Sequence, residues 1–117
     1  MGFAIWAADD PELKRQHESD GTEDYPLAES SGYPYFSVTN VAMRDLRIEM
    51  EAQGFGIVYA FIFNDGDVVT SQEIDLALER SSEIPTTIHD PEGIKLWRDW
   101  LAFLRLASRE HGGVEVQ

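Results

Sequence analysis

The sequence predicts an α+β fold: a single domain (residues 1–117) whose small three- or four-stranded sheet packs against three helices, mainly on one face. Two observations lead to this fold class. Residues 90–113 carry a strong helical pattern, and several short apolar runs typical of strands alternate with further helix signals. A length of 117 residues suits one domain with one core.

The 90–113 segment is the best-defined helix. Asp90 is an N-cap candidate, Pro91 suits the first helical position, and Gly112 and Gly113 supply a stop. Apolar residues cover about half of its circumference, so the helix must be covered by a sheet or by other helices. The predicted core residues on this helix are Trp97, Trp100, Leu101 and Leu104. Its opposite side carries a basic stripe of Lys95, Arg98, Arg105 and Arg109.

Four segments are predicted to be strands, and a short fifth is expected to extend one of them as a hairpin. Residues 3–8 and 33–38 form short runs that are apolar and aromatic. Residues 56–63 (GIVYAFIF) are the most strand-like, and we place them in the middle of the sheet. Residues 68–69 are expected to return from them as a hairpin, and residues 114–116 suit a terminal edge strand.

Two further helices are marked by their ends. Thr39 or Asn40 begins a helix that runs to about Gln53, with Gly54 as its stop. The sequence from Thr70 to Glu73 is a capping box, in which Thr70 is the N-cap, and the helix that follows it runs to about residue 81.

Charge is the most informative global property. The net charge of −13 argues against binding to nucleic acid or to an anionic membrane, and it favours a basic protein partner. Residues 9–29 and 65–83 contribute −11 of this charge. No apolar run approaches the roughly 20 residues that a membrane span requires, so we expect a soluble cytoplasmic protein. The plainer alternative is that the acidity only keeps the protein soluble.

An acidic loop at residues 18–32 is the first candidate binding region, and the basic stripe is the second. The loop is polar, long and punctuated by glycine and proline. Its candidate binding residues are Glu18, Asp20, Glu23 and Asp24.

The sequence predicts no catalytic residue, no metal and no cofactor. Without cysteine, thiolate chemistry is excluded, and no nucleophile elbow or phosphate-binding loop occurs. Residues 64–73 (NDGDVVTSQE) resemble half of a calcium loop, but two ligand positions would fall on Phe61 and Phe63. The pair His89–Asp90 lacks partners at metal-ligand spacing.

Residues 33–117 resemble a family of small bacterial proteins of uncharacterised function. The matching motifs are Tyr35-Phe36, Asn40, the turn at residues 64–66, Val69-Thr70, and Gly112-Gly113-Val114. These motifs are turns and caps, so the resemblance implies one domain in a bacterial cytoplasm and no particular catalytic residue.

Two functions remain open. The first is a non-catalytic protein-binding module, of the immunity or antitoxin type, that neutralises a basic partner. The alternative is a small-molecule-binding protein or enzyme with a site under the 18–32 loop, where the basic stripe would meet an anionic ligand.

Overall fold

The computed structural model describes residues 2–7, 35–62 and 67–116. Four of its elements are strands: β1 (Gly2–Ala7), β2 (Tyr35–Thr39), β3 (Val68–Thr70) and β4 (Gly113–Val116). Three are α-helices: α3 (Asn40–Ala52), α4 (Ser71–Glu79) and α5 (Pro91–Glu110). One turn of 3₁₀-helix, η1 (Val58–Phe61), lies between α3 and β3.

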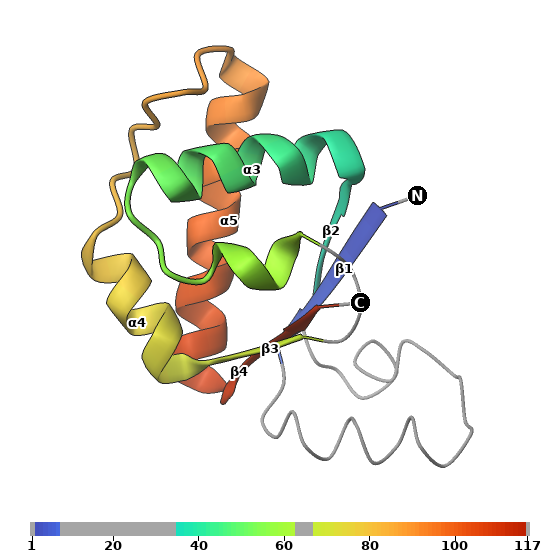
Figure 1. Ribbon diagram of the computed structural model, residues 1–117, viewed down its shortest axis with the longest axis vertical. Helices are drawn as coiled ribbons and strands as arrows, with labels where there is room; N and C mark the ends of the chain where they lie inside the picture. The colour runs from blue at the N-terminus through green and yellow to red at the C-terminus, as the bar shows by residue number, and fades with distance from the viewer. Residues whose placement is uncertain (1, 8–34, 63–66, 117) are drawn as a thin grey trace.

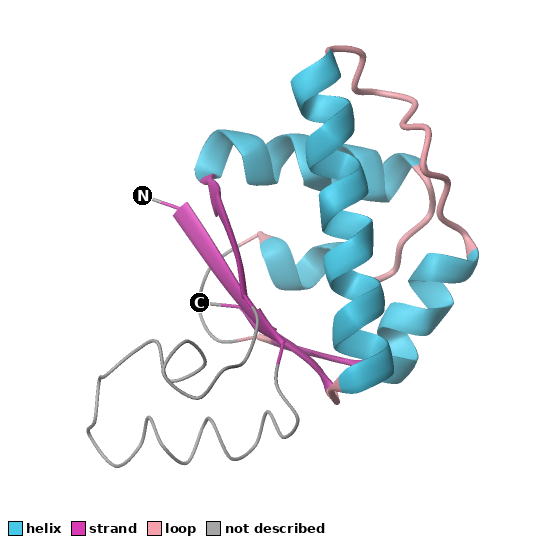
Figure 2. Ribbon diagram, turned by 180° about the vertical axis from the view of Figure 1, so that it is seen from behind, coloured by secondary structure: helices cyan, strands magenta, loops and turns pink. Residues whose placement is uncertain are grey.

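The four strands form one antiparallel sheet in the order β2-β1-β4-β3. All the helices lie on one side of this sheet (Figures 1 and 2). Strand residues on that side are apolar, as in Phe3, Ile5, Val114 and Val116, and they face the helices across a common core. The predicted α+β class, with a small sheet packed against three helices, is confirmed.

Helix α5 is the centre of this core, as its sequence predicts. Trp97, Trp100, Leu101 and Leu104 are fully buried. The Trp100 ring lies between the rings of Phe36 from β2 and Phe61 from η1, with both centroid distances at 5.2 Å. Trp97 and Trp100 are therefore packing residues, which excludes them as the lining of an open ligand site.

The caps that the sequence predicts for α5 and α4 are present. Asp90 accepts from the backbone N–H of Gly93 at 2.8 Å and caps α5. Thr70 accepts from the N–H of Glu73, while the Glu73 carboxylate accepts from the N–H of Thr70 at 3.0 Å, which completes the predicted capping box. The helix that follows, α4, ends at Glu79, slightly earlier than predicted.

The end of α3 is a Schellman motif. Gly54 has a φ of 83°, a value that glycine adopts without strain. The N–H of Gly54 donates to the carbonyl of Glu51, and that of Phe55 donates to the carbonyl of Met50 at 2.9 Å. Phe55 then buries its ring against Trp97, which anchors the end of α3 on α5.

The predicted central strand at residues 56–63 is wrong: residues 58–61 form η1 instead. The buried positions are Ile57, Ala60 and Phe61, which is the spacing of a helical turn and not the alternation of a strand. Arg47 from α3 donates to the carbonyl oxygen of Phe61 at 2.9 Å and so satisfies one backbone group at the end of the turn. A short apolar run does not distinguish these two conformations by itself.

The predicted edge strand at residues 114–116 is a strand, but it lies inside the sheet. β4 pairs with β1 on one side and with β3 on the other, and all four of its residues are buried. This position requires glycine at residue 113 for two reasons. Its φ is 138°, which other residues rarely adopt, and a Cβ there would overlap the carbonyl oxygen of Val69. The expected hairpin between residues 56–63 and 68–69 is replaced by the β3–β4 pair.

Candidate functional site

A shallow trough runs along the exposed side of α3, facing the segment that leads into α5. It consists of two adjoining hollows that share Ile48 and Thr87. The first, of about 410 Å³, is lined by Asp45, Ile48, Thr87, Ile88, His89 and Asp90. The second, of about 330 Å³, is lined by Ile48, Glu51, Ala52 and Thr87. Of these side chains only Ile88 is buried, so the trough is an open surface and not an enclosed pocket.

Local sequence places the α3 side of this trough. The inward stripe of α3 is Met43, Leu46 and Met50, which leaves Asp45 and Ile48 on the outer surface. Ile48 is 50% exposed, although isoleucine is a residue that proteins usually bury. An exposed apolar side chain between acidic neighbours is the distinctive feature of the trough.

Glu49 holds the other wall of the trough in place. This side chain is fully buried in α3, and its carboxylate accepts hydrogen bonds from the backbone N–H and the hydroxyl of both Thr86 and Thr87. The bonds from Thr87 are the shortest, at 2.6 Å for each donor. Gln53 adds a further bond at 2.7 Å. Glu49 therefore fixes the 86–87 segment against α3 without any basic partner among the atoms that it contacts.

The hydrogen bonds determine the charge state of Glu49. Burial alone would raise the pKa of this carboxyl, because a charged group loses hydration. The bonds from Thr87, Thr86 and Gln53 outweigh burial and lower the pKa to about 2. Glu49 is thus ionised at neutral pH, and its lone pairs are occupied, so it serves as a structural anchor and is a poor general base.

The trough offers binding groups and no arrangement for catalysis. The hydroxyl of Thr87 donates to Glu49, but the lowered pKa of that carboxyl makes it too weak a base to activate the hydroxyl as a nucleophile. Asp90 already caps α5 beside His89. In the part of the chain that the structure describes, no three side chains of metal-ligating type lie together. The absence of metal and cofactor remains a prediction for the chain as a whole.

In the described part of residues 64–73, the residues that resemble a calcium loop serve to cap α4. Glu73, the last residue of that stretch, is committed to the capping box and accepts from the Tyr59 hydroxyl at 3.1 Å. The hydrogen bond from Thr70 outweighs the effect of burial, and with the bond from Tyr59 it lowers the pKa of the Glu73 carboxyl. Residues 64–66 of the turn lie outside the described residues.

A third hollow, of about 230 Å³, lies between η1 and α4. It is lined by Gly54, Gly56, Ile57, Glu73, Leu76, Ala77 and Arg80. Its two charged groups already hold neighbouring elements: Arg80 donates to the carbonyl of Gly54 at 3.0 Å, and Glu73 bonds to Tyr59. This hollow is therefore best explained by the packing of η1 on α4.

The basic stripe of α5 lies on the surface as predicted, but two of its members are engaged within the chain. Lys95 contacts Asp99 at 2.7 Å, and Arg105 lies 3.8 Å from Glu83. Arg98 and Arg109 are exposed. Such surface pairs contribute little stability, yet they reduce the positive charge that an anionic ligand would meet.

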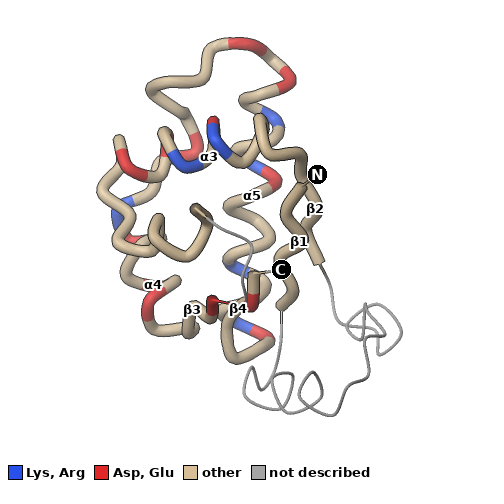
Figure 3. Tube along the Cα trace, turned by 45° about the vertical axis from the view of Figure 1, so that its right-hand side comes forward, with Lys and Arg blue, Asp and Glu red and all other residues tan. Residues whose placement is uncertain are grey.

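The predicted acidic binding residues Glu18, Asp20, Glu23 and Asp24 lie outside the described residues, as does the whole 18–32 loop. The described part of the second acidic segment, residues 67–83, contains α4. Asp75, Glu79 and Glu83 are exposed there. Acidic positions also lie where α5 begins, and both α3 and α5 carry basic as well as acidic positions (Figure 3).

The trough and its anchor were not found from the sequence. One signal was available, since Glu49 lies beside Leu46 and Met50 within the apolar stripe of α3, where a charged residue needs hydrogen-bond partners. Those partners lie 37 and 38 residues further along the chain, at Thr86 and Thr87. Only the fold brings them together.

Comparison with known proteins adds no relatives: no family model, no curated protein and no solved structure matches this chain. The resemblance described for residues 33–117 therefore remains a prediction. Among the described residues, no helix has the length and apolar character needed to cross a membrane.

Proposed function

We propose that this chain is a non-catalytic, cytoplasmic protein-binding module that binds a basic protein partner, in the manner of an immunity protein or antitoxin. The observation that carries this proposal is the asymmetry of charge: two segments contribute −11 of the net −13. Where the second segment is described, Asp75, Glu79 and Glu83 are exposed. A concentrated negative field speeds association with a basic protein and repels nucleic acid and anionic membranes.

The state of the basic stripe supports the same proposal. An anionic small molecule would need cations that are free to contact it, whereas Lys95 and Arg105 are engaged with Asp99 and Glu83. The described hollows are also shallow and bordered by acidic residues, which disfavours an anionic ligand.

The test is affinity capture from the native host, followed by reconstitution with purified components. We expect a captured protein with a basic isoelectric point, and a Kd that weakens steeply between low and physiological salt. A control bait, in which exposed acids such as Glu79 and Glu83 become glutamine together with the acidic residues of 18–24, should capture less of it. Recovery of only acidic proteins, or salt-independent binding by the purified pair, would contradict the proposal.

A further inference from the structure

We propose that the trough beside α3 is the contact surface and that it binds a basic amphipathic helix of the partner protein. In this arrangement an apolar side chain of the partner helix packs on Ile48, and two basic side chains of the same helix face Asp45 and Glu51. This inference rests on the proposed function and narrows it. It assigns the specific contact to a different surface from residues 9–29 and 65–83, whose field then acts at long range.

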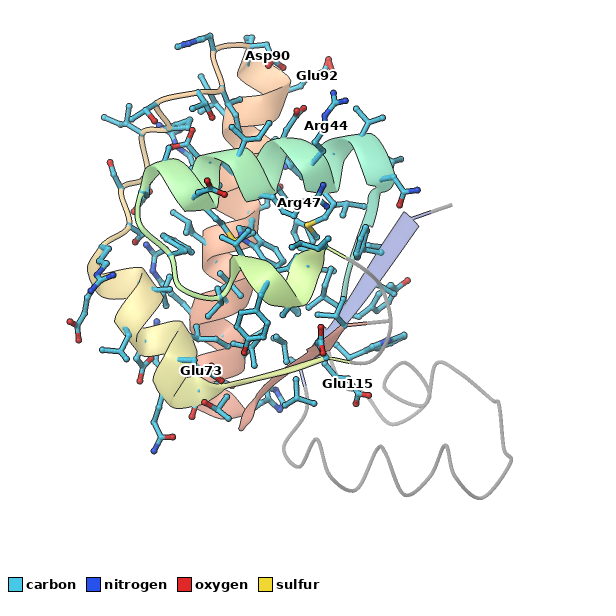
Figure 4. All side chains as sticks on the ribbon, viewed as in Figure 1. Arg44, Arg47, Glu73, Asp90, Glu92 and Glu115 are labelled. Atoms are coloured by element: carbon cyan, nitrogen blue, oxygen red, sulfur yellow. The ribbon has the colours of Figure 1, made fainter. Side chains whose placement is uncertain are left out.

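Charge complementarity gives the first argument for this occupant. The lining of the trough includes the three carboxylates of Asp45, Glu51 and Asp90, and no lysine or arginine is among the residues that line it. Asp90 and Glu92 lie at the start of α5, where Arg44 of α3 points toward them (Figure 4). Arg44 lies 3.8 Å from Asp45. Even with this cation and the roughly +0.5 charge at the start of α5, the trough stays negative.

Spacing gives the second argument. Asp45, Ile48 and Glu51 follow one another at three-residue steps along α3, so each step advances about 4.5 Å along the helix axis. A second α-helix has the same rise, and a basic, an apolar and a basic side chain at three-residue steps would face these three positions in turn. An extended strand, which rises about 3.3 Å per residue and alternates its side chains, does not repeat this spacing.

Exposure gives the third argument. The side chains of Ile48 and Ala52 are open to solvent in a wall that Glu49 holds against Thr86 and Thr87. A rigid wall costs little entropy to order on binding. Apolar side chains that line a groove are the contacts on which helix-in-groove recognition depends.

The experiment uses the full-length protein and a defined probe. The probe is an N-acetylated, C-amidated peptide of about 15 residues in an alanine–glutamine background, long enough for partial helicity. It carries Lys–x–x–Leu–x–x–Lys, and a control peptide of the same composition places these residues at two-residue steps. We expect amide chemical-shift changes in residues 45–52 and 87–90 at 0.15 M salt, and weaker binding of the control peptide.

Charge-matched variants locate the contact. Replacing both Asp45→Asn and Glu51→Gln should weaken probe binding by about five- to tenfold. The pair Glu79→Gln and Glu83→Gln removes the same charge from the other acidic surface, and should change binding by less than about twofold because the Debye length is about 8 Å at this salt. Thermal melts should show that all four exposed substitutions leave the fold intact.

Two further pairs of variants test the sign of the charge effect and the contribution of the apolar contact. Arg44→Gln should strengthen probe binding by about twofold, since it removes a cation beside Asp45, while Arg98→Gln on the far stripe should not. Ile48→Ala should weaken binding by about threefold or more, whereas Leu76→Ala, a truncation of another exposed apolar side chain, on α4, should not.

The outcomes separate this inference from the proposed function. Equal losses for the two acid pairs, or equal binding of the two peptides, would overturn the trough as the contact. If a basic partner is captured from the host and shift changes map to residues 67–83 instead, the proposed function stands and this inference fails. If neither a basic partner nor the probe binds, both fail.

Discussion

At the scale of single residues, Glu49 shows how one buried charge can connect distant segments. Its carboxylate takes hydrogen bonds from Thr86, Thr87 and Gln53, and those bonds replace the hydration that burial removes. A buried charge is stable only with such compensation. The wall of the trough therefore depends on a residue that itself does not line it.

Glu49 should make stability depend on pH. Its pKa is about 2 in the folded protein against an ordinary 4.5, so it stabilises the fold above about pH 4.5, and this contribution is lost as the pH falls toward 2. The shift corresponds to about 3 kcal/mol. Glu49→Gln should lower the free energy of unfolding at pH 7 by about that amount, and the difference from wild type should shrink by pH 3, as measured by urea denaturation.

The exposed Glu79→Gln variant is the control, and we expect it to stay within about 0.5 kcal/mol of wild type at pH 7. A gap between Glu49→Gln and wild type that does not change with pH would show that the carboxylate is not held in its ionised form.

The two central tryptophans differ in one hydrogen bond. Both are fully buried on α5, but Nε1 of Trp97 donates to the carbonyl of Ser82 at 2.8 Å, while Nε1 of Trp100 has no acceptor among the residues that the structure describes. Trp97→Phe should therefore destabilise more than Trp100→Phe, by about 1 kcal/mol, because it removes the hydrogen bond to the Ser82 carbonyl. Thermal or urea unfolding of the two variants measures the difference, and an equal loss in both would show that the Trp97 bond contributes nothing.

At the scale of elements, helix ends obey local rules and strand pairing does not. Asp90, Thr70 and Gly54 each end or begin a helix where their chemistry predicts. Residues 58–61 have the composition of a strand, yet they form a 3₁₀ turn, because Phe61 packs against Trp100 and Arg47 satisfies its carbonyl. Packing against α5 outweighs the β propensity of this run.

The capping box allows a test of α4. Thr70→Ala removes the side-chain acceptor for the N–H of Glu73 and should cost about 0.5–2 kcal/mol in the free energy of unfolding. Thr70→Ser keeps that oxygen and should recover most of the loss. If serine and alanine destabilise equally, the β-branch of Thr70 in β3 is the important feature and not its cap.

At the scale of the whole molecule, the acidic segments and the trough should contribute to different rates. The charge of residues 9–29 acts over a distance set by salt, while a contact in the trough requires docking. The arrangement of the elements agrees with this division, since the start of α5, whose Asp90 lines the trough, and α4 with its acids lie at opposite ends of α5 (Figure 1).

Replacing Glu18, Asp20, Glu23 and Asp24 by their amides should thus slow association with a basic partner several-fold and leave dissociation nearly unchanged. Surface plasmon resonance at several salt concentrations measures both rates, and the dependence of the association rate on salt should become shallower. Faster dissociation in this variant would instead place these residues in the contact itself, and the Asp45→Asn, Glu51→Gln pair provides the comparison.

The sequence by itself determined the helices, their caps, the core face of α5 and the α+β class. It could do so because caps and helical periodicity depend on residues within three or four positions of each other. It also located the acidity, which is a matter of composition.

Only the tertiary structure decided the place of β4 inside the sheet, the 3₁₀ turn at residues 58–61, and the trough. Each depends on partners that are far apart in the chain: β4 lies between β1 and β3, and Glu49 meets Thr86 and Thr87. A buried carboxylate or an interior strand is favourable only when the fold supplies its hydrogen-bond partners. A local sequence pattern does not contain this information, because the partners are distant in the chain.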